Sequence, residues 1–292
     1  MNRRQFLGKS AGILALSSIA SQQLFAAAPN KGRIGIQLYS VRNDLPNDFV
    51  GTLRKISAMG YSAIEPYGFR SEKFFGYTMK ELSDLVGDMG MSISGTHTGS
   101  GILPEDINAP EWDFWKNCAQ WLKSGGGQWA VQAGFPGAQS VDDLKRIAAH
   151  FNRVGQVCRA HGVNFAYHNH HREFAKIEDK VILDFLIENT DPQLVSFQFD
   201  TGHAVRGGAD VVRYLRDYKN RIPLWHASDY DVEKQIYTDV GKGDVPYPEM
   251  FEIAEASGLQ VLTVEQETVE NIFGSLEFNF NYLKQFEWTK VL

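Results

Sequence analysis

Cysteine is scarce in this sequence of 292 residues, in which Cys118 and Cys158 are the only two. One pair of cysteines cannot supply the framework of a small disulfide-stapled fold, so that class of protein is excluded. Both lie in stretches with helical periodicity, where we expect small buried side chains. No cysteine precedes Cys118, which argues against a lipid-anchored lipoprotein.

Positive charge is also in short supply. The sequence has 29 lysines and arginines against 35 aspartates and glutamates, which gives a formal net charge of −6. A nucleic-acid surface normally needs a basic face, because cations must neutralise the phosphates. We therefore expect no nucleic acid among the partners of this protein.

A glycine-rich phosphate loop is the third missing feature. The first predicted strand leads into Gln37-Leu38-Tyr39-Ser40-Val41, which contains no glycine. In a doubly wound open sheet that binds a dinucleotide, a glycine-rich turn follows the first strand. Its absence weakens the open sheet as an alternative fold.

The first 28 residues are organised like an export signal. The pair Arg3-Arg4 is followed by an apolar stretch and then by small residues that end at Ala28. This order resembles a twin-arginine signal, and the stretch is too short and too interrupted by polar residues to be a stable membrane anchor. We expect residues 1–28 to be the signal, residues 29–292 to be the mature domain, and the protein to be exported or periplasmic.

Short apolar runs then alternate with longer amphipathic stretches. The predicted strands span 33–39, 62–65, 91–96, 128–132, 163–167, 195–199, 222–226 and 259–265. The predicted helices span 47–59, 79–89, 111–123, 141–161, 180–188, 210–218, 247–257 and 271–286. Eight strand-then-helix units without a long linker predict a mixed α/β fold, a single (β/α)8 or TIM barrel, with the open sheet as the alternative.

Polar residues gather where the predicted strands end. The catalytic groups of a (β/α)8 barrel lie at the carboxyl ends of its strands, so these positions are candidates for a site. Six of the eight histidines lie there or in the following loops, which scattered surface histidines would rarely do. The polar strand-end residues are Gln37, Glu65, His97, His168, His170, Asp200, His203, His226, Asp229 and Glu265.

The alternation of side chains along a strand predicts which of these groups point into the barrel. Phe197 and Phe199 would face the helices, which leaves Gln198 and Asp200 inside. The same parity turns Glu265 inward. A buried unpaired carboxylate costs several kcal/mol, so inward acids require a cation or a hydrogen-bonding partner.

Four of the strand-end groups make a mixed nitrogen and oxygen ligand set. They are His168, Asp200, His226 and Glu265, each from a different predicted strand. Such a set suits Mn²⁺, Zn²⁺, Fe²⁺ or Co²⁺ better than the all-oxygen sites of Mg²⁺ and Ca²⁺. We expect a divalent metal, Mn²⁺ first and Mg²⁺ as a remaining choice. The alternative is a salt-bridge network that caps the barrel.

Several short polar motifs lie at or near the predicted strand ends. They are His168-Asn169-His170, Asp200-Thr201-Gly202-His203, His226-Ala227-Ser228-Asp229, Gly241-Lys242-Gly243-Asp244-Val245-Pro246 and Glu265. In combination they resemble the xylose-isomerase-like barrels, in the branch called sugar phosphate isomerases/epimerases. The resemblance covers essentially the whole mature chain, and it implies that a divalent metal is held by His168, Asp200, His226 and Glu265.

One departure from this family bears on mechanism. Its keto-sugar epimerases have a glutamate at the strand-five position and use it with the strand-eight glutamate as an acid/base pair. Here His168 takes that place, as in branches similar to inosose dehydratase. The two-glutamate mechanism is therefore not carried over to this chain. Whether Glu173, shortly after the strand, turns back to the metal is open.

The chemistry that the resemblance implies is proton abstraction next to a carbonyl, through an enediolate that the metal stabilises. The candidate bases are His170, then His203, and Glu265 if it doubles as a ligand. Residues expected to contact substrate hydroxyls or a leaving group are Gln37, Glu65, His97, Arg206, Asp229 and Lys242.

Three outcomes are open for the reaction. Reprotonation makes an isomerase or epimerase, our first expectation, and loss of a β-substituent makes a dehydratase or a lyase that cleaves 3-keto-glycosides. A sugar-binding barrel without catalysis is the alternative of another class. Export favours an unphosphorylated sugar, keto-sugar or glycoside as the small-molecule partner. Related barrels often dimerise, so a homodimer is a further expectation.

Four tryptophans are concentrated between residues 112 and 129. Trp112, Trp115, Trp121 and Trp129 could stack on sugar rings, but their largely helical spacing favours packing between helices.

Overall fold

Nine parallel strands form the central sheet of the computed structural model, which describes residues 32–70, 72–267 and 269–290. The strands are β1 (Ile34–Gln37), β2 (Ala63–Glu65), β5 (Ser92–Ile93), β6 (Gly95–Thr98), β7 (Trp129–Gln132), β8 (Asn164–His168), β11 (Val195–Asp200), β12 (Leu224–Ala227) and β15 (Val261–Val264). Their order in the sheet is β5-β2-β1-β15-β12-β11-β8-β7-β6. The predicted signal, residues 1–28, lies outside the described residues.

The third predicted strand is divided into β5 and β6, and together these two pieces close the sheet. β5 pairs with β2, and β6 pairs with β7, so one short segment of chain lies at both ends of the sheet. The backbone N–H of His97 donates to Pro66 O (2.9 Å), and that of Gly68 donates to His97 O (2.7 Å) across the seam. The predicted single TIM barrel is confirmed, with the third strand kinked at the seam.

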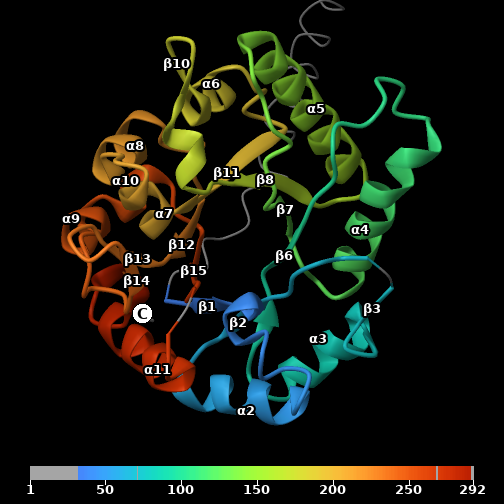
Figure 1. Cartoon of the computed structure of the whole chain (residues 1–292). Helices are drawn as coiled ribbons and strands as arrows, with labels where there is room; N and C mark the ends of the chain where they lie inside the picture. The colour runs from blue at the N-terminus through green and yellow to red at the C-terminus, as the bar shows by residue number, and fades with distance from the viewer. Residues whose placement is uncertain (1–31, 71, 268, 291–292) are drawn as a thin grey trace, which may run out of the picture. The chain divides into compact units, whose positions relative to one another are not determined.

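Helices surround the sheet, as Figure 1 shows. They are α2 (Phe49–Met59), α3 (Met79–Gly87), α4 (Asp113–Ser124), α5 (Val141–Ala160), α6 (Ile182–Glu188), α7 (Thr201–Arg206), α8 (Val211–Asp217), α9 (Tyr247–Glu252), α10 (Ala254–Ser257) and α11 (Ile272–Leu283). Short 3₁₀ turns span Leu38–Val41, Pro110–Trp112, His171–Phe174 and Glu287–Thr289. None of the helices in the described part of the chain is long and apolar enough to cross a membrane.

Three small hairpins interrupt the alternation of strands and helices. They are β3 (Lys73–Phe74) with β4 (Tyr77–Thr78), β9 (Lys176–Ile177) with β10 (Lys180–Val181), and β13 (Asp229–Asp231) with β14 (Ile236–Thr238). The predicted helix 180–188 therefore begins only at Ile182. The predicted helix 247–257 is divided into α9 and α10, and the short helix α7 was not predicted.

Local sequence signals explain where several helices begin and end. Thr78 and Glu81 form a capping box that starts α3, and Ser140 with Asp143 does the same for α5. Gly60 ends α2 with a φ of 106°, in the left-handed region that glycine enters at little cost.

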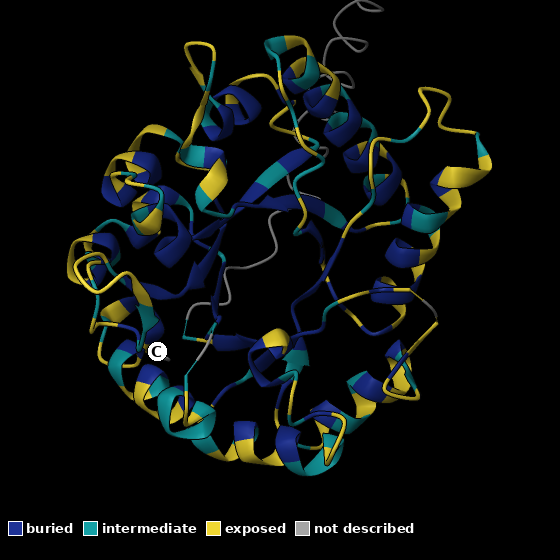
Figure 2. Cartoon of the chain, viewed as in Figure 1, coloured by how far each residue is buried: buried dark blue, intermediate teal, exposed yellow. Residues whose placement is uncertain are grey.

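Two apolar clusters enclose the barrel wall. The larger one lies between the sheet and the helices, whose outer faces are exposed in Figure 2. The smaller one fills the barrel interior with side chains that precede the polar strand ends. Its members are Trp129, Val131, Ala166, Leu224 and Val261. This plug confines the polar groups to the carboxyl end of the barrel. Trp112, Trp115 and Trp121 are buried in the larger cluster, which confirms their predicted packing against helices, whereas Trp129 lies on β7 and packs inside the barrel.

Candidate metal and active site

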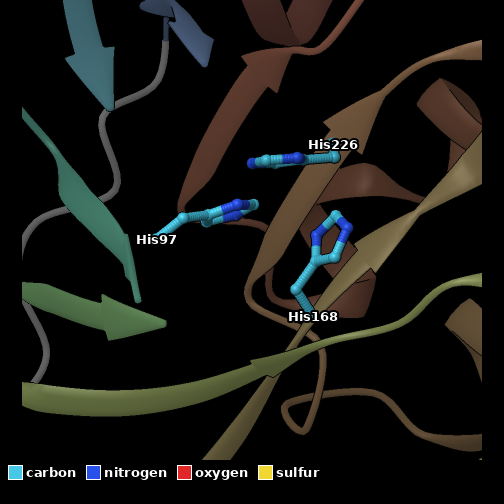
Figure 3. Close-up of side chains that lie close together, drawn as sticks. All are labelled: His97, His168 and His226. Atoms are coloured by element: carbon cyan, nitrogen blue, oxygen red, sulfur yellow. The ribbon is translucent and has the colours of Figure 1, made fainter. Parts of the chain in front are cut away.

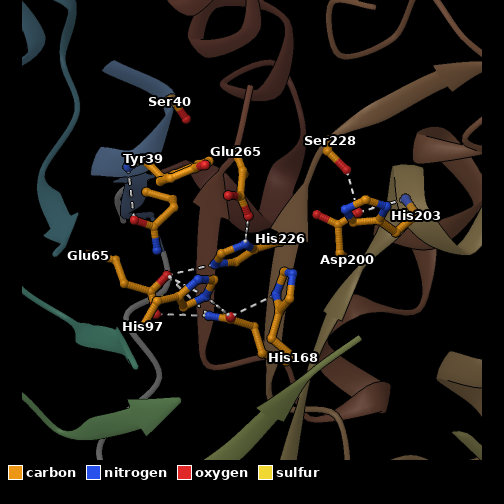
Figure 4. Close-up of polar contacts among 12 residues, drawn as sticks. Tyr39, Ser40, Glu65, His97, His168, Asp200, His203, His226, Ser228 and Glu265 are labelled. Atoms are coloured by element: carbon orange, nitrogen blue, oxygen red, sulfur yellow. Dashed lines mark hydrogen bonds and ion pairs between the residues drawn. The ribbon is translucent and has the colours of Figure 1, made fainter. Parts of the chain in front are cut away.

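Four polar side chains converge at the carboxyl ends of the adjacent strands β8, β11, β12 and β15. Each offers one ligand atom, and these atoms all lie within 4.8 Å of one another. All four side chains are buried, and Figure 4 shows them around one point. The four are His168, Asp200, His226 and Glu265, the same set that the sequence predicts as metal ligands.

Gln198 determines which ring nitrogens of two histidines carry a proton. Its Nε2 lies 3.0 Å from Glu65 Oε1, and only the amide nitrogen can donate to a carboxylate. Its Oε1 therefore accepts from His97 Nε2 (2.6 Å) and from His168 Nδ1 (3.1 Å). His168 thus carries its proton on Nδ1, which leaves the Nε2 lone pair free to bind a cation.

His226 is held between two carboxylates. Its Nε2 lies 2.6 Å from Glu65 Oε2, and its Nδ1 lies 2.7 Å from Glu265 Oε2. Burial alone would lower the pKa of His226, but these two carboxylates raise it to about 10. Burial opposes ionisation of Glu265, yet the hydrogen bond and charge of His226 lower its pKa to about 2. Without a metal, a proton on Nδ1 joins His226 to Glu265.

Glu65 lies beneath His226 and not in the cavity where a substrate would bind. Burial disfavours its charge, but His97 and His226 hold the pKa of this carboxyl below its usual value. Figure 3 shows the rings of His97 and His226 lying nearly parallel, with ring centroids 4.9 Å apart. A metal-binding histidine commonly donates its second N–H to a carboxylate, and Glu65 has that place relative to His226.

Asp200 has one carboxylate oxygen that is hydrogen-bonded and one that is not. Its Oδ1 accepts from the His203 backbone N–H (2.7 Å) and from Ser228 Oγ (2.6 Å). Its Oδ2 is buried and has no hydrogen-bond partner among the described residues. Burial raises the pKa of Asp200, as expected for a carboxylate without a compensating cation. An unpaired carboxylate oxygen among imidazole nitrogens fits a divalent metal.

The Asp200-Thr201-Gly202-His203 motif has a structural reason for its glycine. Asp200 caps the first turn of α7, which packs onto the end of β12. The Gly202 N–H donates to Ser228 Oγ (2.9 Å), and a Cβ at this position would lie 2.6 Å from that oxygen. Glycine therefore allows α7 to approach closely enough to bring His203 over the metal-ligand set.

A cavity of about 460 Å³ lies above these residues. His170 and His203 line it, with ring centroids 4.7 Å apart. Burial and the neighbouring His203 lower the pKa of His170 to about 4, so this ring is neutral and can accept a proton. Two of the three candidate bases are thus side by side, and Glu265, the third, lines the same cavity.

His203 is held in place by two residues that the sequence did not single out. Its Nδ1 bonds the Tyr237 hydroxyl, and its Nε2 lies 3.2 Å from Glu267 Oε1. Burial opposes the charged ring, but Asp200 and Glu267 raise the pKa of His203. Tyr237 comes from the hairpin strand β14, which gives no sequence signal for a site. Glu267 follows Glu265 by two residues, and that spacing could have indicated it.

The other predicted contact residues are divided between the cavity and the surrounding structure. His97 and Arg206 line the cavity. Gln37 is buried below it, where its Oε1 accepts from the Tyr39 backbone N–H (3.1 Å). Lys242 points elsewhere, because its Nζ pairs with Asp239 (2.8 Å).

Asp229 organises a loop and is not brought to the cluster. Its carboxylate accepts four backbone hydrogen bonds at 2.7–3.1 Å, which occupy both oxygens. The donors are Tyr230, Gly241, Gly243 and Val245. The glycine-containing motif 241–246 is therefore folded around Asp229, and a substrate contact by this carboxylate is not supported.

Glu173 does not turn back to the metal-ligand set. Its carboxylate accepts from the Tyr167 hydroxyl and from the His170 backbone N–H (3.2 Å). These contacts fix the 3₁₀ turn that follows β8 and, with it, the position of His170.

Proteins of known structure share this fold. A sugar phosphate isomerase/epimerase from Parabacteroides distasonis superposes with a TM-score of 0.79 at 26% identity, over 92% of this chain and 99% of its own. A 3-keto-D-glucoside 4-epimerase from E. coli superposes with a TM-score of 0.65 at 16% identity, over 89% of this chain and 100% of its own. At the second identity the likeness concerns the fold alone.

Comparison of sequences points to the same kind of barrel. An inosose dehydratase from Clostridium perfringens is 26% identical over 155 residues, or 47% of this chain and 52% of the relative. The chain spans about half the length of this curated relative. The family model of the xylose isomerase-like TIM barrels matches residues 53–290. The chain therefore belongs to the family of xylose isomerase-like TIM barrels, and the proteins that it resembles include a sugar phosphate isomerase/epimerase and inosose dehydratases.

Proposed function

We propose that this protein is a divalent-metal-dependent enzyme that removes a proton next to the carbonyl of a sugar, as an isomerase or epimerase. The observation that carries the proposal is the set His168, Asp200, His226 and Glu265, with the Asp200 Oδ2 atom buried and unpaired. A salt-bridge network alone would leave that oxygen without a cation, at a cost of about 1–3 kcal/mol.

The metal site is completed by lone pairs that the surrounding network leaves available. His168 offers Nε2, Asp200 offers Oδ2, His226 offers Nδ1 once its proton has left, and Glu265 offers its carboxylate. The mixed ligand set favours Mn²⁺, with Zn²⁺, Fe²⁺, Co²⁺ and Mg²⁺ as other choices. A bound ion would polarise a substrate carbonyl and stabilise the negative charge that develops on its oxygen.

His170 is the base in this proposal. It lines the cavity, and its pKa of about 4 keeps the ring neutral near pH 7. His203 lies beside it, and Asp200 and Glu267 raise the pKa of this ring despite its burial, which favours the protonated form that can donate. A neutral and a protonated imidazole side by side supply the acceptor and the donor that an isomerisation needs.

A lyase or dehydratase is the second candidate function. The inosose dehydratase relatives favour it, and so does the histidine at position 168, where keto-sugar epimerases of the family have a glutamate. In this alternative, His203 would protonate the departing oxygen, with Glu267 at Nε2 and Tyr237 at Nδ1 holding the ring.

We further propose that the substrate is an unphosphorylated sugar, keto-sugar or glycoside and that the protein acts after export. Among the described residues, Arg206 is the one lysine or arginine that lines the cavity, so a phosphate group would find a single guanidinium there and no second lysine or arginine. The twin-arginine pattern at the N-terminus supports the same location.

Solvent deuterium exchange tests the proposal. The protein is incubated in D₂O with Mn²⁺ and a keto-sugar or 3-keto-glucoside, and the proton next to the carbonyl is followed by NMR. Metal-dependent exchange that a chelator abolishes would support the enzyme. Binding of the sugar without exchange, in the presence of Mn²⁺ and of Zn²⁺, would leave a sugar-binding barrel as the better explanation.

A further inference from the structure

The cavity above the metal-ligand set is larger than one sugar ring requires. Its volume is about 460 Å³. A hexose occupies roughly 190 Å³ when packed as densely as a protein interior, so two such rings need roughly 380 Å³. After one ring has been placed at His168 and Glu265, enough space for a second remains. Pockets of 300–1,000 Å³ commonly hold ligands of that size.

Two tyrosines form an aromatic wall on this cavity. Tyr39 and Tyr67 both line it, and their rings meet edge to face at 5.2 Å between centroids. Tyr39 keeps 42% of its surface exposed, although large aromatic side chains are usually much better buried. An aromatic ring exposed at a binding cavity offers an apolar surface to the C–H face of a sugar or to another aromatic ring.

The wall is held rigidly. The Arg42 guanidinium lies 4.2 Å from the centroid of the Tyr39 ring and donates to Tyr39 O (2.8 Å). Tyr67 packs against Phe74 (5.7 Å between centroids), and Phe74 packs against Phe49 (6.0 Å). A surface whose side chains are already fixed loses little conformational entropy when a ligand binds.

The same turn joins this wall to the metal-ligand network. Gln37, at the end of β1, accepts a hydrogen bond from the Tyr39 backbone N–H. Gln37 is paired in register with Glu65, the carboxylate that holds His226. The distance between wall and metal ligands is therefore set by the barrel itself and not by a flexible loop.

We propose that the Tyr39–Tyr67 wall is a second-ring subsite, and that the substrate is a glycoside whose aglycone is itself a ring, either a sugar or an aryl group. The inference rests on the proposed function, because it places the reacting sugar at the metal-ligand set. It adds that affinity comes partly from the aglycone, which does not react.

Binding of matched one-ring and two-ring probes tests the subsite. The probes are methyl 3-keto-D-glucopyranoside, its phenyl counterpart, and a disaccharide with the 3-keto group on its non-reducing glucose. Affinities are measured by calorimetry with the Mn²⁺-loaded protein. We expect a two-ring probe to bind about 3- to 10-fold more tightly than the methyl glycoside, as for one aromatic contact. The two-ring probe with the greater advantage identifies the preferred aglycone.

Three variants attribute that advantage to the wall. Tyr39→Ala should abolish the affinity ratio between two-ring and one-ring probes, and Tyr39→Phe should retain it because the ring remains. Phe278→Ala is the matched control, since Phe278 on α11 is also an exposed aromatic residue but does not line the cavity. Equal affinities for all probes in the unmodified protein, or an advantage that survives in Tyr39→Ala, would overturn the subsite.

The same samples separate this inference from the proposed function. Deuterium exchange next to the carbonyl reports the chemistry, whereas the affinity ratio reports the wall. Exchange with equal affinities would refute the subsite alone. An affinity advantage without exchange would refute the proposed enzyme and leave the subsite standing, and failure of every probe to bind would refute both.

Discussion

Replacement of Glu65 by glutamine isolates the role of the carboxylate that lies beneath His226. Glu65→Gln keeps the shape of the side chain and removes its charge. The Glu65 carboxylate is 2% exposed and lies 2.6 Å from His226 Nε2 and 3.0 Å from Gln198 Nε2. It therefore orients His226 so that Nδ1 faces the metal-ligand set, without being one of the four ligands.

The expected loss follows from that geometry. Removal of a carboxylate that supports a metal-binding histidine typically lowers metal affinity about 10- to 100-fold, or about 1.4–2.8 kcal/mol. The close contact and complete burial at Glu65 favour the upper half of that range, because charge-assisted hydrogen bonds are about twice as strong as neutral ones. Asp200→Asn changes a proposed ligand directly and should lower affinity further.

Competition with a chelator of known affinity measures this loss. The matched control is Glu173→Gln, which also neutralises a buried carboxylate after a barrel strand but contacts Tyr167 and His170 in place of the ligand set. We expect the control to retain Mn²⁺ affinity within about twofold. An unchanged affinity in Glu65→Gln, or an equal loss in the control, would refute the role assigned to Glu65.

Three further substitutions test other parts of the structure. His170→Gln should abolish solvent deuterium exchange and leave metal content unchanged, because the ring is assigned as the base and not as a ligand. His150 is buried, and burial followed by the nearby Arg153 lowers its pKa from the usual 6.5 to about 4. As pH falls below 6.5, the unfolded chain binds a proton at His150 before the folded protein does. The contribution of His150 to the free energy of unfolding is therefore complete above pH 6.5 and is lost as pH falls towards 4. His150→Gln should flatten that part of the pH dependence of unfolding. Gly155→Ala should destabilise the protein by about 1–3 kcal/mol in chemical denaturation, because the new Cβ would lie 2.4 Å from the Leu194 carbonyl oxygen.

Each of these expectations has a contrary result. Residual exchange in His170→Gln at the level of the unmodified protein would assign the base elsewhere. An identical pH dependence with and without His150 would show that another group titrates there. Gly87→Ala is the control for Gly155→Ala, since a Cβ at Gly87 would meet no atom within 4 Å. Equal stability of the two alanine variants would contradict the close approach at Gly155.

Side-chain alternation was sufficient to predict the inward groups of the barrel. Gln198, Asp200 and Glu265 point inward as the parity of their strands requires, and the apolar Phe197 and Phe199 pack on the outer face. This succeeded because a strand in a closed barrel has one inner and one outer face. The four predicted metal ligands came together for the same reason.

The roles of individual carboxylates could not be predicted in this way. Glu65 ends β2 and Asp229 lies shortly after β12, and both were predicted to contact substrate. The structure shows that Glu65 supports His226 and that Asp229 accepts four loop N–H groups. The direction of such a side chain depends on donors far away in the sequence. Tyr237 was missed because the hairpin that brings it to His203 has no pattern of its own. The kink between β5 and β6 depends on closure of the whole sheet.

The metal content of the purified protein tests the central claim most directly. Inductively coupled plasma mass spectrometry would be applied to the unmodified protein and to a double variant, Asp200→Ala with His226→Ala. We predict about one equivalent of Mn, Zn, Fe or Co in the unmodified protein, as four converging ligands provide for one ion, and its loss in the variant. The absence of bound metal, together with no uptake after addition of Mn²⁺ or Zn²⁺, would contradict the proposed site and the chemistry built on it.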